Sequence, residues 1–232
     1  MKIQSKNAAS TAGAPGLRSS IETILARYAR VRAHELFGKG SSLWSEFENI
    51  RSALAAAPTI ARFSNVSLKW SAGQGRWATV PWIAALDARE TSKTSEGVYV
   101  IYLFRADLSG VYLTLNQGTA WVMAGYGNDG VTKLRERAAI LRGRVGSLEA
   151  TGFHVGRGID LRSDVSLVRG YEDSTVAFKL YSRGEVPSDE ALIADLEAAL
   201  VAYAKVVPSR KLLGLPGETL AARRLLAPQD DD

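Results

Sequence analysis

The first part of the chain carries hydrophobic residues at helical spacing. Within residues 19–57 they recur every three or four positions, which is the period of an amphipathic helix. We predict one helix over residues 19–37, beginning with a capping box formed by Ser19 and Glu22, and a second helix over residues 43–57. The GKGSS segment separates the two helices, and a proline ends the second.

From residue 63 the pattern changes to that of β-strands. Residues 66–70 alternate between apolar and polar side chains, and SAGQGRW then indicates a tight glycine loop before the apolar segment ATVPWIAALD. Residues 97–118 combine the apolar run GVYVIYLFR, the turn ADLSG and the strand VYLTLNQG. This combination is typical of a β-hairpin.

The second half of the chain mixes both patterns. Helical spacing returns over residues 134–143, TVAFKLYS indicates a strand, and Ser188 is the predicted cap of a long helix that extends to Tyr203. Helices, then strands, then mixed elements predict an α+β fold. We expect a curved, mixed or mainly antiparallel sheet flanked by helices.

We predict a single domain over residues 19–207. It would consist of a helical part, a sheet core and a mixed part, over residues 19–57, 63–118 and 131–207. Residues 1–18 are rich in Ser, Ala, Gly and Lys without an apolar period, which predicts a disordered leader. Residues 208–232 are predicted to form a tail.

Composition narrows the possible chemistry. The 232 residues include no cysteine and only two histidines, His34 and His154, which excludes disulfides, thiolate metal sites and multi-histidine metal sites. No stretch reaches the about 18–20 apolar residues that span a bilayer, and the polar first residues lack the apolar stretch of a secretory signal. We therefore expect a cytoplasmic protein without a membrane segment.

The motifs of several enzyme classes are missing from the sequence. It contains neither GxxxxGK[ST] nor GxSxG, which argues against a P-loop NTPase and an α/β-hydrolase. The acidic residues within 160–173 could hold Mg²⁺, but the arginines between them favour a salt-bridged surface loop. His154 could contact a phosphate, although a surface histidine is the simpler interpretation. We predict no cofactor and no metal site.

Basic and aromatic residues leave two interpretations open. The net charge is +5, and residues 133–183 hold ten Lys or Arg against six Asp or Glu, which fits a phosphate-facing surface or an ordinary solvated helix face. Seven aromatic residues lie within residues 70–112, and most are expected in the sheet core. Trp77 and Trp82, however, flank a proline beside the glycine loop, where aromatic rings can stack on nucleic-acid bases.

The sheet segment resembles a known family of DNA-recognition domains. A glycine loop before an aromatic residue, VPWIA, a polar loop, GVYVIYLF and VYLTLNQG follow one another within residues 63–118. In this order they resemble the N-terminal DNA-recognition domain of McrB, the specificity subunit of McrBC-type modification-dependent restriction enzymes. Weaker similarity continues through LRERA, GFH, IDLRS, YEDSTVAFKLY and the final helix, to about residue 207.

This resemblance implies a non-catalytic module that binds double-stranded DNA carrying 5-methylcytosine or 5-hydroxymethylcytosine. Such domains are expected to flip the modified base into a pocket. Carried over by position, the pocket residues are Trp82, Tyr99 and Leu103. The DNA-inserting loop is Gly73, Gln74 and Gly75. The candidates for contacts with the DNA backbone are Lys69, Arg76 and Lys93.

Two features depart from the family pattern. Gln74 is smaller and more polar than the bulky residue that a flipping loop usually inserts, so it could hydrogen-bond the orphaned guanine or stay outside the duplex. The sequence also has no GTPase or nuclease motif, which implies a separate nuclease or NTPase effector, or a further part of a longer protein. The alternative is a binding or scaffold protein of the same fold that reads another ligand or a protein partner. An enzyme acting on DNA would need a metal or acid–base cluster that the sequence does not show.

Overall fold

The computed structural model describes residues 16–213. The predicted disorder of residues 1–15 and most of the predicted tail lie outside the described residues. The helices are α1 (Leu17–His34), α2 (Trp44–Ala56), α3 (Pro58–Ala61), α4 (Thr119–Tyr126), α5 (Gly130–Val145), α6 (Ser166–Asp173), α7 (Asp189–Ala204) and α8 (Ser209–Leu212), with 3₁₀ turns η1 (Gly127–Asp129) and η2 (Gly146–Thr151). The strands are β1 (Val66–Gly73), β2 (Trp77–Asp87), β3 (Val98–Phe104), β4 (Gly110–Gln117), β5 (His154–Val155) and β6 (Ala177–Ser182).

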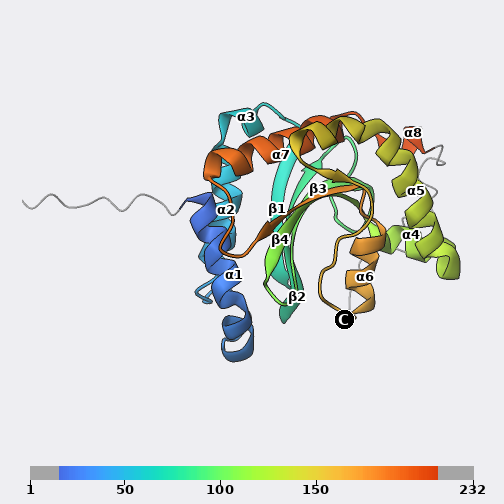
Figure 1. Ribbon diagram of the computed structural model, residues 1–232. Coiled ribbons are helices and arrows are strands. Elements are labelled where there is room, and N and C mark those ends of the chain that lie inside the picture. Colours follow the sequence, from blue (N-terminus) through green and yellow to red (C-terminus); the bar gives the residue numbers. More distant parts are fainter. Residues whose placement is uncertain (1–15, 214–232) are drawn as a thin grey trace, which may run out of the picture.

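The strands form one open sheet. Their order is β1-β2-β3-β4-β6-β5, and each neighbouring pair is antiparallel. Figure 1 shows the sheet strongly curved, with α1 and α2 at one side and α5 and α7 running across it. The prediction of an α+β fold, with a curved and mainly antiparallel sheet flanked by helices, is confirmed.

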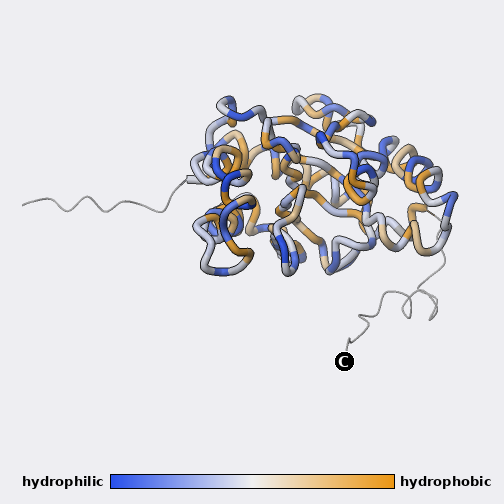
Figure 2. The backbone as a smooth tube through the Cα atoms, turned by 90° about the horizontal axis from the view of Figure 1, so that it is seen from below, coloured by the Kyte–Doolittle hydropathy of each residue, from blue (hydrophilic) through white to orange (hydrophobic). Residues whose placement is uncertain are grey.

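One face of the sheet packs against the helices. Side chains alternate along β3, so Val98, Val100, Tyr102 and Phe104 join α1, α2 and α7 in the main hydrophobic core. The Tyr203 hydroxyl of α7 donates a hydrogen bond to the Val98 carbonyl oxygen at 2.6 Å, which fastens the helix to β3. Figure 2 shows apolar positions along the central elements and polar positions at the outer loops. The opposite face of β3 carries a second, smaller apolar cluster.

Helix α1 begins earlier than the sequence predicts. Leu17 and Arg18 are already helical, so the predicted capping box of Ser19 and Glu22 is wrong, because Ser19 lies inside the helix. The Asp189 carboxylate of α7 caps α1 instead, accepting hydrogen bonds from the backbone amides of Leu17 and Arg18 at 2.9 and 2.7 Å. Glu22 accepts hydrogen bonds from backbone amides in the loop between β6 and α7.

Most other predicted elements are present. The second predicted helix is α2, the predicted hairpin of residues 97–118 is β3 and β4, and the Ser188 hydroxyl caps α7 by accepting from the Ala191 amide at 3.3 Å. The sequence pattern did not predict α4 and α6, because helices of eight residues hold too few apolar positions to show a period. Within residues 16–213, no helix combines the length and apolar character needed to cross a bilayer.

Candidate nucleic-acid interface

The second face of the sheet carries the three residues predicted to form a base pocket. Trp82 of β2 and Leu103 of β3 are cross-strand partners. Tyr99 lies four positions before Leu103 on β3, so both side chains project from the same face. All three residues contribute to one apolar cluster that is separate from the main core. The structure therefore brings Trp82, Tyr99 and Leu103 together on one face of the sheet.

The three residues differ in accessibility. Trp82 is half-buried, whereas Tyr99 and Leu103 are each 0% exposed. The Tyr99 hydroxyl lies 2.9 Å from the carbonyl oxygen of Thr94 and 3.1 Å from that of Gln117. Burial raises the pKa of Tyr99 well above its ordinary value, so the hydroxyl stays protonated and donates. Trp82 is thus the accessible member of the three, whereas Tyr99 and Leu103 are fully buried on the same face of the sheet.

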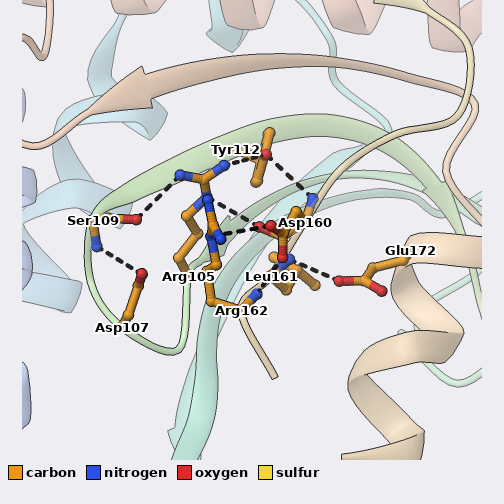
Figure 3. A network of polar contacts seen from close by, with 8 residues as sticks. All are labelled: Arg105, Asp107, Ser109, Tyr112, Asp160, Leu161, Arg162 and Glu172. Carbon is orange, nitrogen blue, oxygen red and sulfur yellow. Dashed lines mark hydrogen bonds and ion pairs between the residues drawn. The ribbon is translucent and has the colours of Figure 1, made fainter. Parts of the chain in front are cut away.

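A segment between β5 and α6 covers part of this face. Ile159 and Leu161 of that segment, together with Val168 and Tyr171 of α6, pack against the apolar cluster. The amide of Ala106, after β3, donates to the Leu161 carbonyl oxygen at 2.9 Å. Figure 3 shows the polar network that holds this covering segment against β3 and β4.

Arg105 lies at the centre of that network. Its guanidinium carbon is 5.0 Å from the Tyr112 ring centroid, and its Nη2 donates to the Tyr112 hydroxyl at 2.7 Å. Its Nε donates to the Asp160 carbonyl oxygen at 3.0 Å. Arg162 Nε lies 3.0 Å from the Asp160 carboxylate. Because Tyr112 is the cross-strand partner of Leu103, these contacts fix one side of the pocket face.

A polar hollow of about 480 Å³ opens beside the covering segment. Its lining residues are Arg157, Gly158, Ile159, Glu172 and Asp173. Glu172 accepts a hydrogen bond from the Leu161 amide at 2.7 Å, and burial raises the pKa of this carboxyl group. Arg157 and Asp173 lie 3.8 Å apart as an ion pair. The hollow therefore presents charges of both signs beside the apolar face.

The predicted DNA-inserting loop is the turn between β1 and β2. Gly73 and Gly75 have φ values of 132° and 67°. A Cβ atom at Gly73 would lie 1.9 Å from the carbonyl oxygen of Arg76, so this position accepts only glycine. Gln74 and Arg76 are exposed. Because β2 also carries Trp82, the turn projects from a strand of the predicted pocket.

The three cations predicted to contact the DNA backbone are exposed: Lys69, Arg76 and Lys93. Lys69 is the cross-strand partner of Ala84, two positions after Trp82 on β2, so Lys69 and Trp82 share a face of the sheet. Lys69 Nζ donates to the carbonyl oxygen of Ser92 at 2.9 Å. This contact brings Lys69 to the loop that carries Lys93.

The other sequence candidates lie at the surface. Arg162 pairs with Asp160, and Arg169 pairs with Asp164 at 2.8 Å, as expected for a salt-bridged loop. His154 is exposed, and its ring centroid lies 4.9 Å from that of Phe178. Among residues 16–213, no three His, Asp or Glu side chains are grouped as metal ligands.

Sequence reasoning missed Arg105 and Tyr112 as parts of this surface. The alternation within VYLTLNQG indicates which residues share a face, but only the register of the hairpin pairs Tyr112 with Leu103. The contact between Arg105 and Asp160 joins positions 55 residues apart, and no local pattern indicates it.

Comparison with known families agrees with this architecture. Residues 23–208 match the MrcB-like, N-terminal domain. The matched range runs from within α1 to the residue before α8, and it includes the whole sheet. No curated protein matched the chain in a sequence comparison. Because the family match covers most of the sequence, the chain belongs to the MrcB-like N-terminal domain family.

Proposed function

We propose that this chain is the DNA-binding specificity module of a modification-dependent restriction system. In this proposal it recognises 5-methylcytosine or 5-hydroxymethylcytosine in duplex DNA by base flipping, and a separate nuclease or NTPase acts as its effector. Membership of the MrcB-like N-terminal domain family supports the DNA-binding specificity role and a non-catalytic module. The modified base, the flipping step and the effector go beyond that membership.

The observation that carries the proposal is the shared sheet face of Trp82, Tyr99 and Leu103. A tryptophan with an accessible side lies on the same sheet face as a buried tyrosine ring and a buried leucine. The accessible side of the indole suits a planar, partly apolar ligand such as a nucleobase, which can stack on it beside the apolar cluster.

The energies are compatible with base flipping. Extrusion of a base costs a few kcal/mol of stacking and pairing, and stacking on an aromatic side chain recovers about 1–3 kcal/mol. Burial of the cytosine methyl group adds only about 1 kcal/mol. Pocket shape must therefore supply the rest of the discrimination, with Leu103 and the ring of Tyr99 fully buried behind the accessible surface.

The turn between β1 and β2 would enter the duplex where the base has left. Gly73 and Gly75 allow the backbone to turn tightly, which leaves the Gln74 amide free to hydrogen-bond the orphaned guanine. Arg76 on the same turn and Lys69 on the pocket face would contact phosphates on either side. Lys93 extends this set along the neighbouring loop.

The test is equilibrium binding to one short duplex in three forms, with cytosine, 5-methylcytosine or 5-hydroxymethylcytosine, at two salt concentrations. We expect the wild type to bind a modified form more tightly, with an affinity that falls as salt rises. Trp82→Ala should lose the preference and keep the salt-dependent binding. Trp121→Ala is the matched control, because Trp121 is also half-buried but lies on α4, where its ring packs against the Arg137 guanidinium.

The same binding assay tests the role of the β1–β2 turn and the alternative of a scaffold protein. Gln74→Ala should weaken binding of the modified duplex, and a fluorescent base analogue at the target position should report less flipping. Equal binding of all three duplexes by the wild type would leave only a non-specific basic surface. No binding to any duplex would instead favour a scaffold protein that reads another ligand or a protein partner.

A further inference from the structure

We infer that Leu36 is an apolar wedge that inserts between base pairs of the bound duplex, beside the β1–β2 turn. The inference rests on the proposed function, because it adds a second contact to the same DNA interface. Leu36 follows the end of α1 and exposes 94% of its surface, whereas the leucines of α1 are buried. Leucine is one of the side chains that proteins insert between base steps to kink DNA.

Leu36 is exposed although its neighbours are fixed. The carbonyl oxygen of Glu35 accepts a hydrogen bond from Trp77 Nε1 at 2.9 Å. On the other side, the Phe37 ring packs edge-to-face against Trp77 at 5.3 Å and against Trp44 at 5.8 Å. The backbone at Leu36 is therefore held on both sides. A side chain presented from an ordered backbone loses little conformational entropy on insertion.

The same contacts place Leu36 beside the turn that is proposed to enter the duplex. Trp77 begins β2 directly after that turn. The Tyr28 hydroxyl of α1 lies 3.1 Å from the carbonyl oxygen of Ala72 and 2.9 Å from that of Ala78, so α1 is attached to both strands at the base of the turn. In Figure 1 the C-terminal end of α1 and the β1–β2 end of the sheet lie at the same end of the molecule.

The charges around Leu36 favour nucleic acid as the occupant. Five cations lie on the second half of α1, the loop after it and the turn: Arg27, Arg30, Arg32, Lys39 and Arg76. The carboxylate next to Leu36, that of Glu35, accepts hydrogen bonds from the Ser41 hydroxyl at 2.9 Å and the Ser42 amide at 3.2 Å. Within the described part of the chain, Arg30, Lys39 and Arg76 form no ion pair. Unpaired cations around an apolar tip suit phosphates around an opened base step.

A second exposed leucine, Leu167, differs from Leu36 in the charges beside it. Leu167 of α6 is also strongly exposed, at 60%, but its neighbour Arg169 is paired with Asp164. An exposed leucine beside neutralised charges lacks the electrostatic attraction that brings DNA to Leu36. A wedge at Leu36 also adds, at a neighbouring base step, the apolar bulk that Gln74 lacks.

The test compares Leu36→Ala with Leu167→Ala in the full chain. Both side chains are exposed, so circular dichroism and the melting temperature should stay unchanged. With the duplex that contains modified cytosine, we expect Leu36→Ala to bind roughly tenfold more weakly, because the apolar surface of the wedge is lost. Energy transfer between dyes on the two duplex ends should also report less bending. Leu167→Ala should match the wild type in both measurements.

The outcomes separate this inference from the proposed function. Wild-type preference for the modified duplex, with Leu36→Ala binding and bending it like the wild type, would overturn the wedge and leave the proposed function intact. A wild type without any preference for modified cytosine would remove the proposed function and the wedge together. As a further check, Lys39→Ala should lower the slope of log affinity against log salt by about 0.9 if this patch contacts phosphate.

Discussion

The indole Nε1 of Trp77 donates a hydrogen bond to the Glu35 carbonyl oxygen at 2.9 Å. Glu35 caps the C-terminal end of α1 and Trp77 begins β2, so one bond joins the first helix to a strand of the proposed pocket, 42 positions later. The Tyr28 ring packs edge-to-face on Trp77 at 5.5 Å. The placement of the β1–β2 turn relative to α1 therefore depends on this tryptophan.

Trp77→Phe tests that dependence. The substitution keeps an aromatic ring against Tyr28 but removes the donor to Glu35, so we expect the free energy of unfolding to fall by about 1 kcal/mol. Urea unfolding measures the change. Trp82→Phe is the control, because no hydrogen bond from the Trp82 indole is found among residues 16–213, and its loss should stay within about 0.5 kcal/mol. Equal losses for the two variants would contradict a role for the hydrogen bond.

Tyr99→Phe separates the hydroxyl group from the ring. The hydroxyl faces the carbonyl oxygens of Thr94 and Gln117, so its removal should lower the free energy of unfolding by about 1 kcal/mol. The preference for modified DNA should remain, because the ring stays in place. Tyr99→Ala would cost about 3–5 kcal/mol at a fully buried position, which makes it a poor probe of binding. Lost preference with unchanged stability in Tyr99→Phe would show that the hydroxyl contacts the base.

The sequence predicts the positions of the strands better than it predicts which side chains share a face of the sheet. In β3 every residue is apolar, so the run from Val98 to Phe104 indicates a buried strand but no alternation. Which residues join Trp82 on the second face becomes visible only from the register with β2 and β4. The proposed pocket residues were identified from a family resemblance, and the common face of Tyr99 and Leu103 follows from their even spacing.

Local sequence patterns do not predict contacts between segments that are distant in the sequence. Ser19 and Glu22 have the spacing of a capping box, yet Asp189 caps α1 from 172 positions away. The Asp189 carboxylate is a stronger hydrogen-bond acceptor than a serine hydroxyl, and only the tertiary fold brings it to the start of α1. Leu36 likewise looks like one more apolar residue near the end of a helix, and only its exposure distinguishes it.

Glu48 makes the stability of the folded protein depend on pH in the acidic range. Its carboxylate binds Arg51 and accepts a hydrogen bond from Trp70 Nε1 at 3.1 Å, and these contacts lower the pKa of Glu48 from 4.5 to about 2. Because the pKa is lowered in the folded state, the stabilisation is complete above pH 4.5 and is lost as the pH falls toward 2. Glu48→Gln should therefore reduce stability at pH 7 and have little effect near pH 2.

Denaturant unfolding of wild type and Glu48→Gln at several pH values measures this difference. The effect should be small, because the carboxylate is largely exposed to water. Glu149→Gln is the control, since Glu149 is exposed and forms no salt bridge within residues 16–213. A difference between wild type and Glu48→Gln that does not change from pH 7 to pH 2 would contradict the assignment.

Asp189 connects the two ends of the domain, because a carboxylate at the start of α7 caps the start of α1. Asp189→Ala leaves the backbone amides of Leu17 and Arg18 without their acceptor, and we expect a loss of about 1 kcal/mol. Glu190→Ala is the matched control, because Glu190 shares the first turn of α7 but makes no bond to α1. It should cost only a few tenths of a kcal/mol, from the lost interaction with the helix dipole.

Amide hydrogen exchange shows which helix is affected. In Asp189→Ala the first turn of α1 should exchange faster, whereas in Glu190→Ala it should not. If both variants lost the same stability and left α1 protected, the carboxylate would stabilise only its own helix, and the tie between the two helices would have to come from their apolar contacts.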